Sequence, residues 1–530
     1  RLSLVGSEMC IRDSVRITPV GTRGLMVDLP DLATVMNWHA FLKANPLPRQ
    51  TDVIAAARTV LLTFDSPTAT REAADRLASI SPSSAEQRAP RDVEIAVLYD
   101  GADTTSLAES LHMSVDELIA WHTSTTWVAA FGGFAPGFTY CVPEDPARAL
   151  SVPRLTSPRT EVPAGAVAVA GEFSAVYPRT SPGGWQLIGT THTPMWDSAA
   201  TPPALVAPGD RVHYRAVDAL EDATETSHYH LATPPRRPIF SVDDPGMQTL
   251  YQDLGRQGNG NLGVTTSGSA DRASARTANA AVGNKRNATL LENIGGLTLT
   301  ALAETVICVT GADADVTVGG RPALLATPTI VPAGAEVVVA PARLGMRTYI
   351  AVRGGLIADT ELDSAATDML SGLGPDPIRA GDTIAMSLTR PQSANALLSN
   401  PLRVRKEGAT TTGTVRVVLG PRDDWFSPAA IEQFLSTTYT VTAESNRVGL
   451  RLDSEQGLER ARTEELPSEG MVAGSVQIPP SGQPVVFLRD HAVTGGYPVI
   501  ATVINEDVDI ATQLPPGGTI RFELFEEKND

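Results

Sequence analysis

At 530 residues the chain is too long for one hydrophobic core and predicts three or four domains, and its composition, 42% hydrophobic and 19% charged, is typical of a globular protein. A net charge of −18 would repel a phosphodiester backbone and no Lys/Arg cluster offsets it, so nucleic acid is excluded as an expected partner. Three widely spaced cysteines without a CxxC pair, and no apolar run near 18 residues, predict a cytoplasmic protein without a disulfide framework, zinc site or membrane span.

Residues 1–14 continue into no predicted element, and we interpret them as a non-native tail. Over residues 15–92 short β patterns alternate with helical patterns, which predicts a small α/β domain. The predicted strands are 15–19, 24–29 and 59–63, and the predicted helices are 32–44 and 68–78.

Residues 93–218 predict a second domain made mainly of short strands. A strand at 93–99 precedes two helices, 105–112 and 114–123, and Ser114 with Glu117 predicts a capping box for the second helix. From residue 127 onward glycine and proline separate short strands, a rhythm typical of a β-barrel or sandwich.

Residues 219–238 are acidic and then proline-rich, which predicts a linker. Its two histidines, His228 and His230, have no further ligands nearby and predict a solvated pair rather than a metal site. The second half is again rich in predicted strands, with helices at about 269–282 and 428–435. We expect two barrels in this half, over 239–395 and 396–530, with their seam near 390–401.

A ten-residue pattern occurs twice, at 181–190 and at 493–502, and similar predicted strands precede and follow both copies. This repeat indicates a duplicated unit. Each copy contains a diglycine turn followed by an aromatic residue, and adjacent glycines leave backbone N–H groups open to a carboxylate or phosphate. Tight strand connections in a β-rich core are the alternative interpretation. The two turns are Gly183-Gly184-Trp185 and Thr494-Gly495-Gly496-Tyr497.

Charged residues near these turns are candidates for chemistry. Arg159 follows a proline, and an arginine placed in this way can clamp a carboxylate or phosphate, although it can also bridge surface loops. Arg489 and His491 adjoin the second diglycine turn. His491 is a candidate general acid or base, with a surface histidine as the alternative.

A second group of candidates surrounds a glycine-rich loop. Asp253 and Arg256 precede the G-x-G-x-x-G pattern at 258–263, but residues 264–267 resume an extended pattern instead of a helix, so we expect no dinucleotide site. Asp271 stands at a predicted helix start and is either an N-cap or an active-site carboxylate.

These residues carry a family resemblance. The chain resembles a pair of proteins known as allophanate hydrolase subunits 1 and 2, as Kip-type kinase inhibitor and antagonist, or as the B and C subunits of 5-oxoprolinase. Residues 15–217 resemble the first member of the pair, and residues 239–526 resemble the second. The fused chain also resembles the carboxyltransferase region of urea carboxylase. The first resemblance rests on Gly133-Phe134-x-Pro136-Gly137-Phe138-x-Tyr140, Pro158-Arg159-x-x-Val162-Pro163-Ala164-Gly165 and Ser181-Pro182-Gly183-Gly184-Trp185. The second rests on Gln252-Asp253-x-Gly255-Arg256, Asn279-x-x-Val282-Gly283-Asn284, Leu291-Glu292, Gly311-Ala312-Asp313, Arg447-x-Gly449-x-Arg451-Leu452 and Thr494-Gly495-Gly496-Tyr497-Pro498.

The resemblance implies a mainly β, α+β fold in which a small N-terminal α/β domain is followed by tandem cyclophilin-like β-barrels. It also implies an ATP- and Mg²⁺-dependent 5-oxoprolinase component that phosphorylates the lactam of 5-oxoproline, a small acid, and that works with a separate A-like 5-oxoprolinase subunit. The alternatives are a biotin-dependent carboxyltransferase and a non-catalytic kinase regulator. The chain departs from the family at three places, which are Thr190, where the family often has Arg, residues 362–367, and Val493. These departures leave the identity of the substrate undecided.

The predicted site combines these candidates, without an assigned metal ligand, and the oligomeric state, including a homo-oligomer, is left open. The predicted catalytic residues are Asp253, Asp271, Arg489 and His491. The predicted substrate- or phosphate-binding residues are Arg159, Gly183, Gly184, Trp185, Arg256, Thr494, Gly495, Gly496 and Tyr497.

Overall fold

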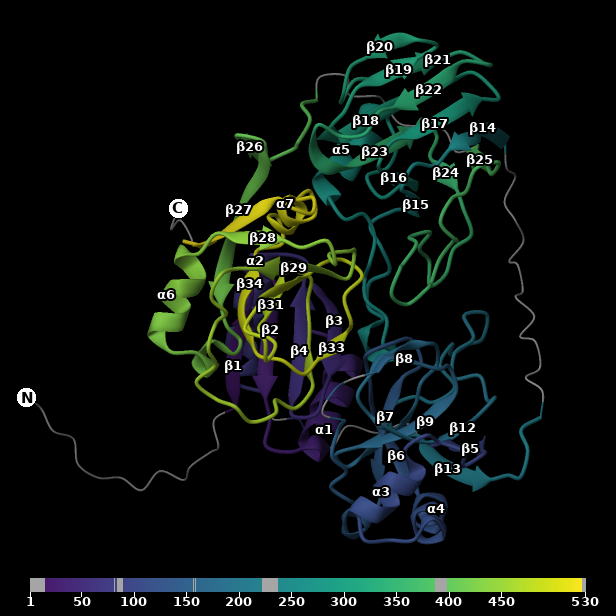
Figure 1. The fold of residues 1–530 in the computed structure, drawn as a ribbon, viewed down its shortest axis with the longest axis vertical. Helices are drawn as coiled ribbons and strands as arrows, with labels where there is room; N and C mark the ends of the chain where they lie inside the picture. The colour runs from purple at the N-terminus through teal and green to yellow at the C-terminus, as the bar shows by residue number, and fades with distance from the viewer. Residues whose placement is uncertain are drawn as a thin grey trace, which may run out of the picture.

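The computed structural model describes residues 15–80, 82, 89–155, 157, 159–221, 237–386 and 398–526. The predicted tail, the two linker histidines and most of the predicted seam near 390–401 lie outside these residues. Figure 1 shows the first strands of the chain, in purple, beside its last strands, in green and yellow. Segments at opposite ends of the sequence therefore pack together.

The N-terminal domain is an antiparallel four-stranded sheet in the order β1-β2-β4-β3. Asp31 and Ser66 cap its two helices by accepting hydrogen bonds from the N–H groups three residues on. All strands and helices predicted here are present, and β3 is an additional strand. The elements are β1 (Arg16–Val20), β2 (Gly24–Asp28), α1 (Leu32–Ala44), β3 (Gln50–Ala55), β4 (Thr59–Phe64) and α2 (Pro67–Leu77).

The second domain is a seven-stranded barrel in the order β12-β9-β10-β7-β6-β13-β5. Leu98 and Thr190 exchange backbone hydrogen bonds of 2.9 and 2.8 Å and close it. The predicted capping box of Ser114 and Glu117 is present. The elements are β5 (Asp92–Val97), α3 (Thr104–Ser110), α4 (Val115–Ser124), β6 (Trp127–Gly132), β7 (Thr139–Pro143), η1 (Pro146–Arg148), β8 (Arg159–Val162), β9 (Ala166–Ala170), β10 (Phe173–Val176), β11 (Ser181–Gly183), β12 (Gln186–Thr190) and β13 (Arg211–Ala216).

The third domain encloses one core between sheets of seven and five strands. A tight corner at Gly246, with a φ of +66°, sends the chain from the first sheet into the second. The alanine-rich face of α5 packs on the second sheet. The elements are β14 (Arg237–Asp244), β15 (Gln248–Gln252), η2 (Gly260–Leu262), α5 (Arg272–Ala281), β16 (Leu290–Ile294), β17 (Leu297–Ala301), β18 (Thr305–Asp313), β19 (Val316–Val318), β20 (Arg321–Ala323), β21 (Thr329–Val331), β22 (Glu336–Val339), β23 (Leu344–Val352), β24 (Leu356–Ile357) and β25 (Thr383–Met386).

The C-terminal domain is a second closed barrel, in the order β26-β27-β34-β31-β32-β29-β28-β35 with β35 also paired to β27. Ser427 caps its longest helix, α6. The elements are β26 (Arg405–Glu407), β27 (Thr410–Leu419), η3 (Asp423–Trp425), α6 (Pro428–Ser436), β28 (Tyr439–Val441), β29 (Gly449–Asp453), β30 (Glu469–Gly470), β31 (Ser475–Gln477), β32 (Val485–Phe487), β33 (Thr494–Gly495), β34 (Val499–Val503), α7 (Val508–Ala511) and β35 (Thr519–Leu524).

The two barrels share one topology. Around the first barrel the strands run β5, β12, β9, β10, β7, β6 and β13, and around the second they run β27, β34, β31, β32, β29, β28 and β35. In both, only the first and last strands of the circle pair in parallel. The diglycine turns also occupy equivalent places, because β11 pairs with β8 and β33 pairs with β30. The duplication predicted from the repeated pattern is confirmed.

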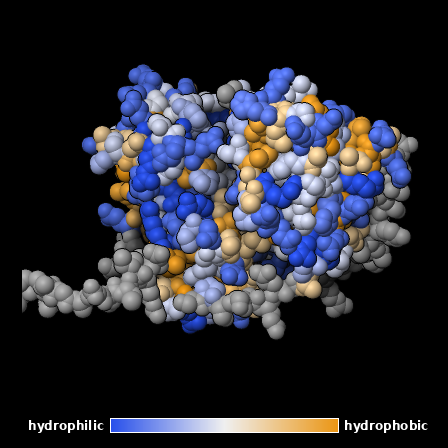
Figure 2. All heavy atoms as spheres, turned by 90° about the horizontal axis from the view of Figure 1, so that it is seen from below, coloured by the Kyte–Doolittle hydropathy of each residue, from blue (hydrophilic) through white to orange (hydrophobic). Residues whose placement is uncertain are grey.

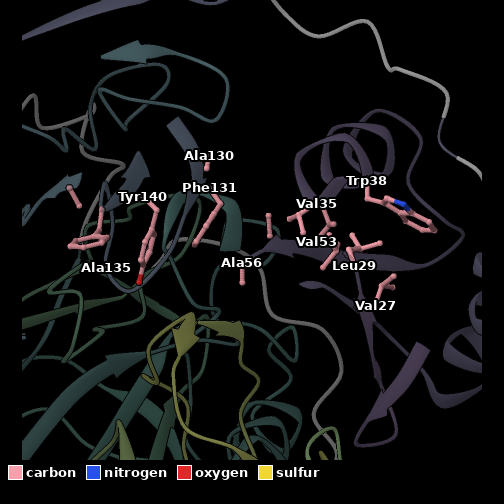
Figure 3. Close-up of a cluster of buried hydrophobic side chains, with 14 of the residues drawn as sticks. Val27, Leu29, Val35, Trp38, Val53, Ala56, Ala130, Phe131, Ala135 and Tyr140 are labelled. Carbon is pink, nitrogen blue, oxygen red and sulfur yellow. The ribbon is translucent and has the colours of Figure 1, made fainter. Parts of the chain in front are cut away.

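The N-terminal domain contacts both barrels. Its core continues into that of the first barrel, and Figure 3 shows this hydrophobic cluster running from Trp38 and Val53 to Phe131 and Tyr140. The opposite face of its sheet packs on the C-terminal barrel, where buried side chains gather around Val493. These side chains are Val20, Met26, Ile54 and Leu61.

The face of the molecule seen from below is mostly polar. Figure 2, which views the molecule from below, shows hydrophilic residues over most of this face and hydrophobic residues in small separate groups. In the part of the chain that the structure describes, no helix combines the length and apolar character needed to span a membrane.

Candidate anion-binding site

Two cavities lie where the N-terminal domain, α5 and the C-terminal barrel meet, and the glycine-rich loop at 257–267 also lines the first of them. The first has a volume of about 310 Å³ and the second about 550 Å³. They share part of their lining, so they adjoin. The shared residues are Arg23, Arg272, Arg276, Arg489 and Asn505.

The glycine-rich loop forms one wall of the first cavity because it is wedged between two domains. The Asp52 carboxylate on β3 accepts a hydrogen bond of 3.0 Å from the Gly260 N–H. Gly263 has a φ of +78°, and a Cβ there would overlap the Ala135 carbonyl oxygen of the first barrel. A short 3₁₀ turn, and not the α-helix of a dinucleotide loop, is formed here. The loop therefore joins two domains, and the absence of a dinucleotide site stays a prediction.

Helix α5 brings two arginines to the cavities. Arg272 begins the helix and Arg276 follows one turn later, so both project from the same face. The Arg272 Nη2 atom donates to the Leu254 and Ser267 carbonyl oxygens at 3.4 and 3.1 Å, whereas its buried Nε has no partner in the structure. Arg276 makes no hydrogen bond or ion pair with another described residue. Both guanidiniums keep donors free for a ligand.

Arg489 and Arg23 complete the shared wall. Arg489 follows β32, and its Nη2 lies 2.9 Å from an Asp509 oxygen. The Asp509 carboxylate also accepts hydrogen bonds of 3.1 Å from the first two N–H groups of α5. Arg23, in the β1–β2 turn, lies 2.5 Å from Glu506. Each of these arginines therefore has one carboxylate partner that fixes its position.

The four guanidiniums repel one another. Burial, followed by the charge of Arg489, lowers the pKa of Arg272 well below its usual range, although Asp509 opposes this change. Because like charges are held together in a partly buried place, an entering anion would relieve their repulsion and satisfy their free donors. The arrangement is therefore suited to a carboxylate or phosphate.

His491 supplies a neutral imidazole to the first cavity. Its Nδ1 lies 2.8 Å from the Ala492 carbonyl oxygen and must donate to it, which leaves Nε2 as an acceptor without a described protein partner. Burial lowers the pKa of His491 to about 4. The imidazole is therefore uncharged at neutral pH and can accept a proton from a bound reactant.

Asp52 is a second titratable group on the first cavity. Burial raises its pKa to about 6, although the Gly260 and Val53 N–H groups favour the charged form. Burial therefore reverses the usual order of the two pKa values on this cavity, because that of Asp52 is raised to about 6 and that of His491 is lowered to about 4.

The predicted catalytic residues fall into two groups. Arg489 and His491 line the first cavity. Asp271 lies behind the wall as the N-cap of α5, where its carboxylate accepts from the Ser274 N–H at 2.9 Å and from the Gln513 amide at 2.9 Å. Burial, followed by the charge of Asp509, raises the pKa of Asp271 to about 6.

Asp253 and Arg256 line neither cavity. The Asp253 carboxylate accepts hydrogen bonds from the Gly255 and Ala365 N–H groups at 2.7 and 2.9 Å, which tie two loops together. Arg256 is buried and donates to the Ala366 carbonyl oxygen, and its Nε and Nη1 have no partner in the structure.

The diglycine turns form packed corners between strands. Gly183 stands opposite Arg159 in the ladder of β11 and β8, and Gly495 stands opposite Glu469 in that of β33 and β30. A Cβ on Gly183 would overlap the Tyr177 hydroxyl. Neither turn lines either cavity, so their role in anion binding stays a prediction.

The other predicted binding residues accompany these turns. Thr494 accepts a hydrogen bond of 3.1 Å from the Phe134 N–H, which docks the second turn on the first barrel. Trp185 packs edge-on against Tyr140, Arg159 lies 2.6 Å from Asp103, and Tyr497 is 40% exposed. None of these four side chains lines the two cavities.

Charged residues at the cavities that were not predicted from the sequence include Arg23, Asp52, Arg272, Arg276, Arg403, Glu506 and Asp509. Arg23 and Asp52 occupy an ordinary turn and strand, and nothing in their local pattern distinguishes them. Arg272 and Arg276 carry a usable signal, because positive charges at a helix N-terminus are opposed by the helix dipole. Asp509 lies in a short helix near the end of the chain.

Known proteins resemble both halves of this chain. Residues 15–206 match the family described as carboxyltransferase domain, subdomain C and D, and residues 262–524 match carboxyltransferase domain, subdomain A and B. The C subunit of 5-oxoprolinase from Haemophilus influenzae is 31% identical over 290 residues, which are 54% of this chain and 91% of that protein. This chain belongs to the carboxyltransferase-domain family.

Two further relatives of this carboxyltransferase-domain protein agree with its division into halves. The B subunit of 5-oxoprolinase from Escherichia coli O157:H7 is 41% identical over 129 residues, which are 23% of this chain and 57% of that protein. The crystal structure of TTHA0988 is 33% identical, covers 94% of this chain and 99% of that one, and superposes with a TM-score of 0.81. The chain thus joins a region similar to the B subunit to one similar to the C subunit.

Proposed function

We propose that this protein is a fused B and C component of an ATP-dependent 5-oxoprolinase, which phosphorylates the lactam of 5-oxoproline before its ring is opened. The observation that carries the proposal is a cavity with arginines from both halves. Arg23 comes from the half similar to the B subunit, whereas Arg272, Arg276 and Arg489 come from the half similar to the C subunit. Because both halves contribute arginines to this cavity, they would act as one unit.

The proposed reaction matches the groups on the cavity. An amide carbon is a poor electrophile, and phosphorylation of its oxygen supplies a leaving group. The lactam oxygen attacks the γ-phosphorus, the bond between that phosphorus and ADP breaks, and the lactam N–H proton passes to Nε2 of His491. The arginines stabilise the charge on the transferring phosphoryl group. On a separate A-like partner subunit, one water then adds to the activated carbon and the ring C–N bond breaks, which frees the amine and leaves an acyl phosphate. A second water hydrolyses this acyl phosphate to glutamate and phosphate.

The residues fit ATP as a substrate, because guanidiniums bind phosphate oxygens in pairs. Within the described ranges no cluster of three or more metal-ligating side chains is found. Mg²⁺ usually keeps several waters and binds through substrate phosphates with one or two carboxylates, so the ion would enter with ATP. A cytoplasmic location and a homo-oligomer stay predictions.

The test is ATP turnover by the purified protein, with and without 5-oxoproline and a cognate A-like subunit. We expect ADP release that depends on 5-oxoproline, and a loss of about 10²-fold in the His491→Asn variant, which keeps a donor for the Ala492 carbonyl but lacks the Nε2 acceptor. Arg343→Gln, which removes an exposed arginine paired with Asp313, is the matched control. No lactam-dependent ADP in any combination would exclude the proposal.

A biotin-dependent carboxyltransferase is the second candidate, because both family descriptions name that domain. The same arginines could hold the carboxylate of carboxybiotin. This candidate predicts urea-dependent loss of a labelled carboxyl group from carboxybiotin, without ATP turnover. The two assays together therefore distinguish the candidates.

A further inference from the structure

We infer that the two cavities are separate subsites of one centre: the second holds the triphosphate of a nucleoside triphosphate, and the first holds the small lactam acid. This inference rests on the proposed function and goes further by placing the nucleotide. The triphosphate would lie outside both barrels, between the N-terminal domain, α5 and the C-terminal barrel. The arginines common to both cavities would lie where the two reactants meet.

The lining of the second cavity is suited to a polyanion. It contains the four shared arginines and a fifth, Arg403, and the remaining polar side chains include the amides Asn400 and Asn505. Among the described residues, Glu506 and Asp509 are the two carboxylates that line this cavity beside the five guanidiniums. A chain of phosphates, with several charged oxygens in a row, matches several guanidiniums better than one carboxylate can.

The two carboxylates already have partners. Asp509 accepts from the N–H groups of Arg272 and Ala273 and pairs with Arg489. Glu506 pairs with Arg23. The side chains of Arg272 and Arg276 consequently face the cavities without a carboxylate of their own in the part of the chain that the structure describes.

Arg403 is held in place from behind. Its Nη1 lies 2.8 Å from Asp507, a carboxylate that does not line the cavity and that also pairs with Arg416 at 2.7 Å. Arg403 lines the second cavity but not the first. Its guanidinium should therefore contact the part of a triphosphate that the lactam acid does not reach.

The first cavity is smaller and of mixed character. Its lining combines Ile54 and Val493, which are apolar, with Thr51 and Thr63, whose hydroxyls are 2.8 Å apart. His491 is found on this cavity and not on the second. A small lactam acid has a ring, an amide and a carboxylate. The apolar side chains of this cavity would contact the ring, its hydroxyls the amide and its arginines the carboxylate.

The test measures the binding of tripolyphosphate, ATP and 5-oxoproline separately, by calorimetric titration of the full chain. For Arg403→Gln we expect about a 10-fold loss of affinity for tripolyphosphate and ATP, with 5-oxoproline affinity within about 2-fold of the wild type. For His491→Asn we expect about a 10-fold loss of affinity for 5-oxoproline, with the affinities for tripolyphosphate and ATP within about 2-fold of the wild type. For Arg276→Gln we expect the affinities for the phosphate ligands and for 5-oxoproline all to fall at least about 5-fold, because this arginine lines both cavities. Arg343→Gln is the control for loss of a distant positive charge.

The free phosphate chain distinguishes this site from recognition of a base. Equal effects of Arg403→Gln on ATP and tripolyphosphate support a phosphate subsite, whereas loss of ATP binding alone overturns it. Lactam-dependent ATP turnover with unchanged tripolyphosphate binding in Arg403→Gln and Arg276→Gln would refute the inference and leave the proposed function standing. Selective binding losses without any lactam-dependent turnover would support the two subsites and refute the proposed function. Circular dichroism of each variant shows whether it is folded.

Discussion

His122 is enclosed by polar partners inside the first barrel. The Tyr99 hydroxyl lies 2.6 Å from its Nδ1, and the Ser174 Oγ lies 2.8 Å from its Nε2. Ser174 donates in turn to Tyr214 at 3.2 Å, so Nε2 carries the proton and Nδ1 accepts from Tyr99. Burial lowers the pKa of His122 to about 3. It is a neutral structural group.

This burial predicts an acid-sensitive contribution to stability. The unfolded chain protonates His122 near pH 6.5, but the folded protein does so only near pH 3, so acid favours unfolding through this interval. At pH 5 the linkage amounts to about 2 kcal/mol. His122→Gln should lower the Tm at pH 7 and show a smaller fall in Tm between pH 7 and pH 5. An equal fall in variant and wild type would contradict this explanation.

Asp271 can be assigned to one of its two predicted roles by a pair of variants. Asn can cap a helix as well as Asp, whereas Ala cannot, and loss of a cap costs about 1 kcal/mol. Asp271→Asn keeps the cap on the Ser274 N–H but places an amide donor against the Gln513 amide, so it should lose at most about 1 kcal/mol and keep its activity. Asp271→Ala loses the cap as well and should lose about 2 to 3 kcal/mol. Urea unfolding and ATP turnover measure the two effects. Full stability with lost turnover in Asp271→Asn would instead assign proton transfer to this carboxylate.

At the scale of elements, the glycine-rich loop packs so closely on the first barrel that there is no room for a side chain at Gly263. Gly263 and Gly209 both have positive φ values, +78° and +91°. A Cβ at Gly263 would overlap the Ala135 carbonyl, whereas a Cβ at Gly209 would meet no described atom within 4 Å. The two positions therefore separate backbone strain from steric overlap.

Alanine at both positions tests this separation. Gly209→Ala should cost about 1 kcal/mol from the positive φ alone, and Gly263→Ala should cost at least about 2 kcal/mol more because the loop must move. Urea unfolding measures both. Because the same loop walls the first cavity, Gly263→Ala should also weaken 5-oxoproline binding. Equal losses of stability would show that the overlap is relieved without strain.

The elements were predictable where the signal is local. The helix at 32–44 and the capping box at Ser114 were predicted closely, because caps and periodicity act over a few residues. The repeated diglycine pattern also predicted the duplicated barrels. The two separate sheets of the third domain were not predicted, because the pairing of β14 and β15 in different sheets depends on the corner at Gly246 and on distant strands.

At the scale of the whole molecule, a buried arginine ties the N-terminal domain to the C-terminal barrel. Arg422 lies 2.5 Å from Asp28 of β2 and also pairs with the buried Glu469 of β30. Without Arg422 the Glu469 carboxylate would be left buried and unpaired, which costs about 3 to 5 kcal/mol. Arg422→Met should therefore lower the Tm measured by calorimetry.

Arg462→Met is the matched control for this change. Arg462 pairs with Asp424 at 3.1 Å on the surface, and exposed pairs contribute at most about 1 kcal/mol. Comparable shifts in the two variants would rule out a special role for the buried pair.

The cavities themselves could not be predicted because the distant packing of the chain creates them. Arg489 and His491 were chosen for their chemistry, and both line the first cavity. Arg23 and Asp52 reach it only because the first sheet packs on the last barrel, and no local pattern encodes that contact. The diglycine turns were predicted as binding residues because their pattern is repeated. A repeat also results from the duplication of the barrels, so it does not by itself indicate chemistry.

The contact of the first domain with the last also bears on how such proteins can be divided. If the chain were separated between residues 221 and 237, one fragment would still hold Arg23, Asp28 and Asp52 and the other would hold the surface that receives them. The two fragments would be expected to reassociate and rebuild the arginine wall, so splitting or joining the genes of such a pair need not alter the chemistry. A covalent link between the two halves would matter mainly at low protein concentration, where separate fragments would dissociate.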